Sequence, residues 1–222
     1  VNMKDVVITT SQIPNYAFYE KQSLTRFVFP HNINRIGYSA FAGTSLTGDL
    51  VIPNGVEIID YNAFGVCVKG NSYAGLNLYG TLTLPESLKY VGESAFQSAS
   101  LVGELRLPSS IQYIGKRAFG FNSFSGELIL PEKLLELGDE AFAYNNFSGS
   151  LKIPYGIISI PAGCFNRCAF DGELILHDNI LHINRGAFVG CSFRGELVLP
   201  KNIISIGEEA FMGNFFSGQL VL

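Results

Sequence analysis

The sequence predicts an α/β solenoid, in which short coils stack on one another in a single array over residues 1–222. Phenylalanine recurs at a step of 23 residues, with one longer step of 32 residues. The column contains Phe18, Phe41, Phe64, Phe96, Phe119, Phe142, Phe165, Phe188 and Phe211. Prolines keep the same step from Pro30 to Pro200, with His177 in the vacant slot. A period in the twenties is typical of solenoids, whose repeats contact only their neighbours, so we expect about nine repeats.

Each repeat begins with a short predicted strand. Leu105 and Leu107 alternate with polar residues, and this period of two is typical of a half-buried strand. Pro108 ends the strand, because proline has no N–H for the ladder. We expect these strands to form one parallel sheet on the concave face, at 27–29, 50–52, 82–84, 105–107, 128–130, 151–153, 174–176, 197–199 and 220–222.

The remainder of each repeat is expected to form the convex side from loops and short turns of α- or 3₁₀-helix. Ile111 and Ile114 are predicted to point inward, and Phe119 is predicted to insert into the core. Asn or Cys follows three residues after most phenylalanines of the column, as at Asn145 and Cys168. We expect this side chain to bond the backbone of the turn, because buried backbone polar groups need partners.

The array is irregular in three places. Residues 1–23 form an irregular half-repeat, in which 5–8 are candidates for a first strand. A nine-residue insertion lies within 65–80. It is either a tolerated surface loop or a binding loop, with candidate contacts Lys69, Asn71 and Tyr73. The last repeat is incomplete and the chain starts with Val1, so we expect a fragment of a longer protein whose signal and anchor lie elsewhere.

The composition disfavours several functional classes. The chain is 47% hydrophobic and 15% charged, which argues against disorder. A net charge of −4 without a basic run disfavours nucleic acid as a partner, and no apolar run approaches the length of a membrane span. The sequence has no catalytic triad order, phosphate-binding glycine loop or metal-ligand motif. We therefore expect no catalysis, no cofactor and no metal.

The four cysteines are Cys67, Cys164, Cys168 and Cys191, and none belongs to a CxxC pair. Cys168 and Cys191 are one period apart, so they are expected on adjacent coils. Two interpretations follow, a disulfide between these coils or small buried thiols that fill the core, and we favour the second.

Three motifs carry a resemblance to a known family: Leu128-Ile129-Leu130-Pro131, Ile206-Gly207-Glu208-Glu209-Ala210-Phe211 and Ala187-Phe188-Val189-Gly190-Cys191. The chain resembles the BspA-like leucine-rich repeat family over residues 24–222. It departs from that pattern by an extra residue before most strands and one fewer after the phenylalanine. The resemblance implies a right-handed superhelix. It also implies adhesion or ligand binding, without catalysis, by a surface-exposed or secreted protein of gut or oral bacteria.

The outward positions of the predicted sheet are the candidate binding surface. An acidic column stands beside a mostly aliphatic one, and we expect partner contacts from Asp49, Glu104, Arg106, Glu127, Ile129, Lys152, Glu173, Ile175, Glu196 and Val198. The acidic column is either a solvated face or part of a footprint for a basic or polyhydroxylated ligand. The aliphatic column favours a protein partner, because it offers no aromatic platform for a sugar and the chain has no Trp.

The leading hypothesis is a non-catalytic binding module that docks a host or extracellular protein on the concave sheet. The alternatives are a structural spacer that presents another domain and a glycan-binding surface subunit. The incomplete last repeat leaves an open sheet edge, which predicts end-to-end dimers.

Overall fold

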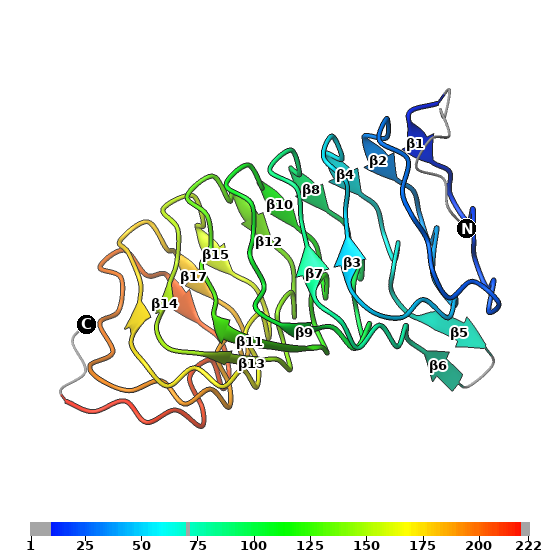
Figure 1. Cartoon of the computed structure of the whole chain (residues 1–222). Helices are drawn as coiled ribbons and strands as arrows, with labels where there is room; N and C mark the ends of the chain where they lie inside the picture. The colour runs from blue at the N-terminus through cyan, green and yellow to red at the C-terminus, as the bar shows by residue number, and fades with distance from the viewer. Residues whose placement is uncertain (1–9, 70–71, 219–222) are drawn as a thin grey trace.

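The computed structural model describes residues 10–69 and 72–218 and shows a stack of coils that runs from the N-terminal to the C-terminal end (Figure 1). Each coil passes through three sides in turn: a side that carries the Leu-Pro motif, a side that carries the Ile-Gly motif, and a side that leads into the next coil. The predicted solenoid is confirmed. The distribution of strands among the three sides differs from the prediction.

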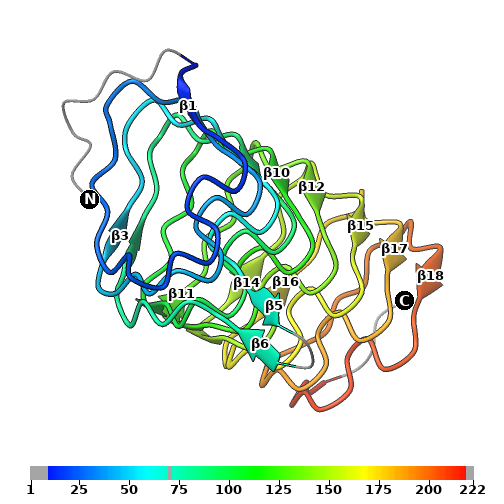
Figure 2. The same cartoon turned by 90° about the vertical axis from the view of Figure 1, so that its right-hand side faces the viewer.

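The Ile-Gly side carries the most regular sheet, which the sequence analysis treated as a turn. Its six-stranded parallel part consists of β1 (Gln12–Ile13), β2 (Arg35–Ile36), β4 (Ile58–Ile59), β8 (Tyr90–Val91), β10 (Tyr113–Ile114) and β12 (Glu136–Leu137). The row runs on through β15 (Ser159–Ile160), β17 (His182–Ile183) and β18 (Ser205–Ile206), as Figure 2 shows. Ile114 is buried, as predicted. A Cβ on the following Gly115 would lie 2.5 Å from the backbone nitrogen of Glu93, so close approach of the coils requires glycine there.

The Leu-Pro side carries fewer strands than predicted. β3 (Leu50–Val51) pairs with β7 (Leu82–Thr83), and β14 (Leu151–Lys152) pairs with β16 (Leu174–Ile175). The predicted strands at 27–29 and 197–199 are reduced to single bridges, and those at 105–107 and 128–130 are absent. The remaining predicted strand, 220–222, and the candidate strand 5–8 lie outside the described residues.

The middle coils carry strands earlier in the repeat. On the third side, β11 (Ser123–Glu127) lies between β9 (Val102–Gly103) and β13 (Asn146–Ser148). These three strands precede the inward leucines of their coils. In the coils of Leu105 and Leu128, strand pairing is therefore found before the Leu-Pro motif and not within it.

The insertion forms an antiparallel hairpin of β5 (Cys67–Lys69) and β6 (Ser72–Ala74), which projects from the stack in Figure 1. The insertion does not disturb the packing of the core. The rings of Phe64 and Phe96, on either side of it in sequence, stack with centroids 5.3 Å apart and an interplanar angle of 1°. The neighbouring pair Phe41 and Phe64 stacks at 5.0 Å. An added loop of this kind leaves the coil-to-coil spacing intact.

The segment around each phenylalanine of the column, here called the Phe turn, is not helical, and the described residues contain no α- or 3₁₀-helix. Two residues before the phenylalanine the backbone is left-handed, with φ of 55° at both Arg117 and Glu140. Alternate N–H groups then point to the next coil. Phe119 N–H donates to the Ala141 carbonyl oxygen at 2.9 Å. The helical prediction was wrong because a helix keeps its hydrogen bonds within itself, whereas this turn uses them between coils.

The Asn or Cys side chain three residues after the column phenylalanine bonds the turn backbone, as predicted, at Asn122, Asn145, Cys168, Cys191 and Asn214. Asn145 Nδ2 donates to the carbonyl oxygens of Phe119 at 3.0 Å and Phe142 at 2.9 Å, and its Oδ1 accepts from the Phe124 N–H at 3.1 Å. In other coils a cysteine at this position makes one of these bonds. The Cys191 thiol donates to the Phe165 carbonyl oxygen.

All four cysteines are free and buried, so the disulfide interpretation was wrong. Burial raises the pKa of the Cys191 thiol to about 12, and burial also raises the pKa of the Cys164 and Cys168 thiols. The low dielectric of the core disfavours the thiolate in each case.

The Asn145 network predicts the stability of two variants. Asn145→Leu removes both donors and the acceptor, leaves buried backbone groups without partners, and lowers the free energy of unfolding by about 3 kcal/mol. Asn145→Cys loses less than half as much, because a thiol can still donate to a turn carbonyl, as Cys191 does. Chemical denaturation measures both. Equal losses for the two variants would contradict this account.

The buried thiols predict alkaline destabilisation. A thiol in the unfolded chain ionises near pH 8.5, whereas the folded thiols stay protonated to higher pH. Above about pH 8.5 the unfolded state therefore binds fewer protons, and stability falls as the pH rises. Each buried thiol contributes about 1.4 kcal/mol per pH unit in this range. Cys191→Ala is expected to reduce the loss of unfolding free energy by about 1.4 kcal/mol per pH unit, as measured by chemical denaturation from pH 8 to 11. An unchanged slope would show that the thiol does not stay protonated.

Candidate functional site

The outward residues of the Leu-Pro side form the candidate binding surface, here called the Leu-Pro face. Leu128 and Leu130 are buried, whereas Ile129 between them is 67% exposed. The same alternation exposes the other aliphatic residues of the predicted column. Each of them is at least 43% exposed: Val28, Val51, Ile175 and Val198. A row of apolar side chains therefore faces solvent along the stack.

The acidic column on this face is partly neutralised. Arg106 contacts Glu104 two residues away at 2.9 Å, and Lys152 contacts Glu132 at 2.9 Å. Both pairs are solvent-exposed, so each adds little stability. Besides Glu104, the carboxylates of the column are Asp49, Glu127, Glu173 and Glu196, and they make no ion pair within the part of the chain that the structure describes. Carboxylates without an ion pair therefore occur along the face from Asp49 to Glu196.

Asp49 stabilises the coil that follows the insertion. Its Oδ1 accepts hydrogen bonds from both the backbone N–H and the hydroxyl of Thr81, each at 2.8 Å. These bonds favour the carboxylate and lower the pKa of Asp49 below its usual range. The side chain thus links the coils on the two sides of the hairpin, in addition to any contact with a partner.

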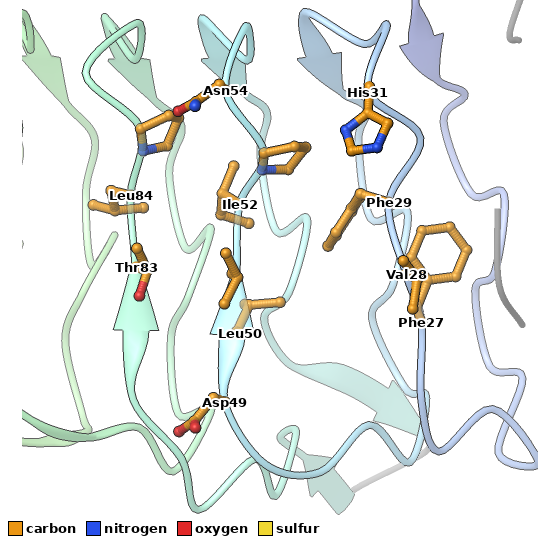
Figure 3. Close-up of a pocket in the computed structure, with 13 residues that line it drawn as sticks. Phe27, Val28, Phe29, His31, Asp49, Leu50, Ile52, Asn54, Thr83 and Leu84 are labelled. Carbon is orange, nitrogen blue, oxygen red and sulfur yellow. The ribbon is translucent and has the colours of Figure 1, made fainter. Parts of the chain in front are cut away.

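A groove of about 650 Å³ crosses the N-terminal coils of the Leu-Pro face (Figure 3). Leu50, Ile52 and Leu84 contribute to its apolar middle. Polar groups stand at its ends, with Asp49 at one end and His31 and Asn54 at the other. Sequence reasoning placed no groove here. The available signal is side-chain size. Three successive outward positions hold short side chains, Val28, Val51 and Thr83, and the next four positions hold longer ones, Arg106, Ile129, Lys152 and Ile175.

Two of the predicted contacts of the insertion, Lys69 and Tyr73, fall on the hairpin and are not among the residues that line this groove. Lys69 is the last residue of β5 and pairs with Ser72 of β6, whereas Tyr73 pairs with Val68. Asn71 lies outside the described residues.

Two of the three histidines, His177 and His182, have structural partners. The His177 ring stacks on Tyr155 with centroids 4.7 Å apart, and its Nε2 lies 2.8 Å from the Pro154 carbonyl oxygen. Nδ1 of His182 lies 2.9 Å from the Ser205 hydroxyl. Within residues 10–69 and 72–218, no group of three or more His, Cys, Asp or Glu side chains is placed to hold a metal. Over the same ranges, no helix has the length and apolar character of a membrane span.

The sequence matches the family model described as the BspA type leucine-rich repeat region over residues 2–71, 68–170 and 122–217. The chain belongs to this family. The comparison with curated proteins gives no match.

Solved structures resemble this chain at low sequence identity. YopM from Yersinia enterocolitica WA-314 aligns with a TM-score of 0.52 and 16% identity over 89% of this chain, which spans 41% of the YopM chain. A leucine-rich cell surface protein from Faecalibacterium prausnitzii A2-165 has a TM-score of 0.48 and 22% identity, with 91% of this chain and 69% of that chain covered. A leucine-rich repeat protein from Bacteroides ovatus ATCC 8483 has a TM-score of 0.48 and 20% identity, with 91% and 67% covered.

The Asp49 contacts predict a low pKa that depends on Thr81. An NMR titration of the Asp49 carboxylate is expected to give a midpoint below about 3.9, the value for an unperturbed aspartate. Thr81→Val removes the hydroxyl donor and keeps the N–H donor, so the midpoint is expected to rise part of the way back. A midpoint that Thr81→Val leaves unchanged would contradict the assigned hydroxyl contact.

Proposed function

We propose that this chain is a non-catalytic binding module of a bacterial cell-surface or secreted protein, and that it docks a protein partner on the Leu-Pro face. The observation that carries the proposal is the exposed aliphatic row, in which Ile129 is 67% and Val198 is 54% exposed. Apolar side chains that face solvent in a row are typical of the centre of a protein interface. The family supports a binding role and the proposed location.

The Leu-Pro face suits a partner with an apolar centre and a basic rim. Ile129, Ile175 and Val198 supply the apolar contacts, and the nearby carboxylates Glu127 and Glu173 favour lysine or arginine on the partner. Charged rims of this kind act mainly on the association rate and on specificity. From Val28 to Val198 the face spans seven coil steps, or roughly 34 Å at about 4.8 Å per step, which suits an interface of ordinary size.

The groove of Figure 3 is the natural place for an anchoring side chain of the partner. Interface energy concentrates in a few residues that fill desolvated pockets. Leu50, Ile52 and Leu84 offer an apolar surface to such a residue, and His31 and Asn54 can bond its polar end. The proposed contacts at Asp49, Glu104, Arg106, Lys152 and Glu196 are polar and exposed, and they are expected to contribute less.

A spacer that presents another domain is the alternative function. The rigid stack serves that role equally well, and a spacer requires no partner on the Leu-Pro face. End-to-end pairing of the array also remains a prediction, which the exposed Phe215 in the last described coil supports.

A binding experiment with matched variants tests the proposal. Immobilised chain is exposed to purified extracellular-matrix and host-surface proteins, and affinity for any protein that binds is measured for two double variants. Ile129→Lys with Val198→Lys places charge in the proposed centre and is expected to weaken binding by about tenfold or more. Leu135→Lys with Ile204→Lys is the control. Leu135 and Ile204 lie in the same coils and are 62% and 68% exposed on the Ile-Gly side.

The control variant is expected to bind like the unchanged chain. Equal loss in both variants would show that the Leu-Pro face has no special role. Absence of binding to every protein of the panel would favour the spacer.

A further inference from the structure

A second groove, distinct from the Leu-Pro face, lies along the Phe turns of the N-terminal coils and has a volume of about 360 Å³. It shares no lining residue with the groove of Figure 3. Its walls come from successive coils, beginning with tyrosines at Tyr16, Tyr38 and Tyr61 and ending at Arg117. From Tyr16 to Arg117 the groove crosses four coil steps, or roughly 19 Å at about 4.8 Å per step.

One tyrosine presents a ring face to this groove. Tyr38 and Tyr61 stack with centroids 4.8 Å apart and an interplanar angle of 12°. On the other side of Tyr61 lies the next coil, which is placed by a hydrogen bond from Asn62 N–H to the Glu93 carbonyl oxygen at 2.9 Å. That coil carries Glu93 where a further tyrosine would continue the stack, so the second face of Tyr61 is free of aromatic contact. Tyr61 is 40% exposed.

Polar groups without internal partners stand beside this ring face. Glu93, Ser94 and Gln97 line the groove from one coil, and within the described residues their side chains make no hydrogen bond. Ser94 is only 7% exposed and has a left-handed backbone, with φ of 57°. The Ser94 hydroxyl meets solvent in the groove, where a ligand can take the place of water as its hydrogen-bond partner.

Arg117 closes the far end of the groove in a fixed orientation. Its Nε and one terminal nitrogen donate to the two carboxylate oxygens of Glu140 at 2.9 and 3.0 Å. This pairing raises the pKa of Arg117 above its usual value. A guanidinium carries five N–H donors, so three remain for a ligand.

We propose that this groove binds a short oligosaccharide. A sugar ring has an apolar face of C–H groups, which packs flat against an aromatic ring such as Tyr61, and a rim of hydroxyls that both donate and accept hydrogen bonds. The carboxylate of Glu93, the hydroxyl of Ser94, the amide of Gln97 and the guanidinium of Arg117 together offer both kinds of partner. The groove extends over several coils, which suits an oligosaccharide better than a single sugar.

Other ligand classes fit this groove less well. A phosphate would face the carboxylate of Glu93, and Arg117 is already neutralised by Glu140. An apolar peptide would leave Ser94 and Gln97 unpaired, which costs free energy. A quaternary ammonium group requires several aromatic faces around it, whereas Tyr38 and Tyr61 use one face each for their mutual contact. The aromatic platform that the Leu-Pro face lacks is therefore supplied on a different side of the coil.

Saccharide binding is tested by NMR titration with cellotetraose, xylotetraose, mannotetraose and chitotetraose. At least one is expected to shift the resonances of Tyr61 and Ser94. Tyr61→Ala is expected to weaken that binding by about tenfold, which corresponds to the loss of one aromatic platform, and Gln97→Ala is expected to weaken it by less. Tyr155→Ala is the matched control, because Tyr155 is exposed and lies outside the groove.

Circular dichroism checks that each variant is folded. Binding that survives Tyr61→Ala, or an unchanged spectrum with all four sugars at millimolar concentration, would overturn the proposal. Shifts at Tyr61 produced by inorganic phosphate or by choline in place of the sugars would also overturn it. The variant Ile129→Lys with Val198→Lys is expected to keep saccharide binding, so this result is independent of the proposed protein partner.

Discussion

The structure depends on the hydrogen bonds that each Phe turn donates to the next coil. Arg117, Phe119 and Phe121 all donate their N–H groups in one direction, to the carbonyl oxygens of Asp139, Ala141 and Ala143. The left-handed residues make this possible, since they turn alternate peptide groups toward the neighbour. Above this ladder the phenylalanine rings stack throughout the array, for example at 5.8 Å between Phe119 and Phe142. The spacing of the stack, and with it the spacing of every exposed column, follows from these contacts.

The sequence was sufficient to predict what repeats. The 23-residue step identified the phenylalanine column, the inward leucines and the role of residues such as Asn145, because each depends on one position recurring in register. It did not reveal that Arg117 and Glu140 adopt left-handed backbone conformations, which glycine or asparagine usually marks. A short segment that ends in Ala-Phe has helical propensity, and only the tertiary hydrogen bonds between coils override it.

The same reasoning predicted one candidate surface and missed another. Ile129 and Val198 were assigned to the exposed face from alternation alone, and they are exposed. The tyrosine groove combines Tyr61, Ser94 and Gln97, which stand at three different positions of the repeat. No single column contains them, and only the path of the Phe turn brings them together. Departures from the repeat, rather than the repeat itself, are therefore the places to look for function in this fold.

Residue-resolved hydrogen exchange tests the central claim, that the Phe turns bind each coil to the next. The account predicts strong protection for the amides of Phe119, Phe142 and Phe165, each of which donates to the following coil. The amide of Phe211, which has no acceptor among the described residues, is predicted to exchange much faster. Equally fast exchange at all four phenylalanines would contradict the claim, because it would show that the turns are not held by their neighbours.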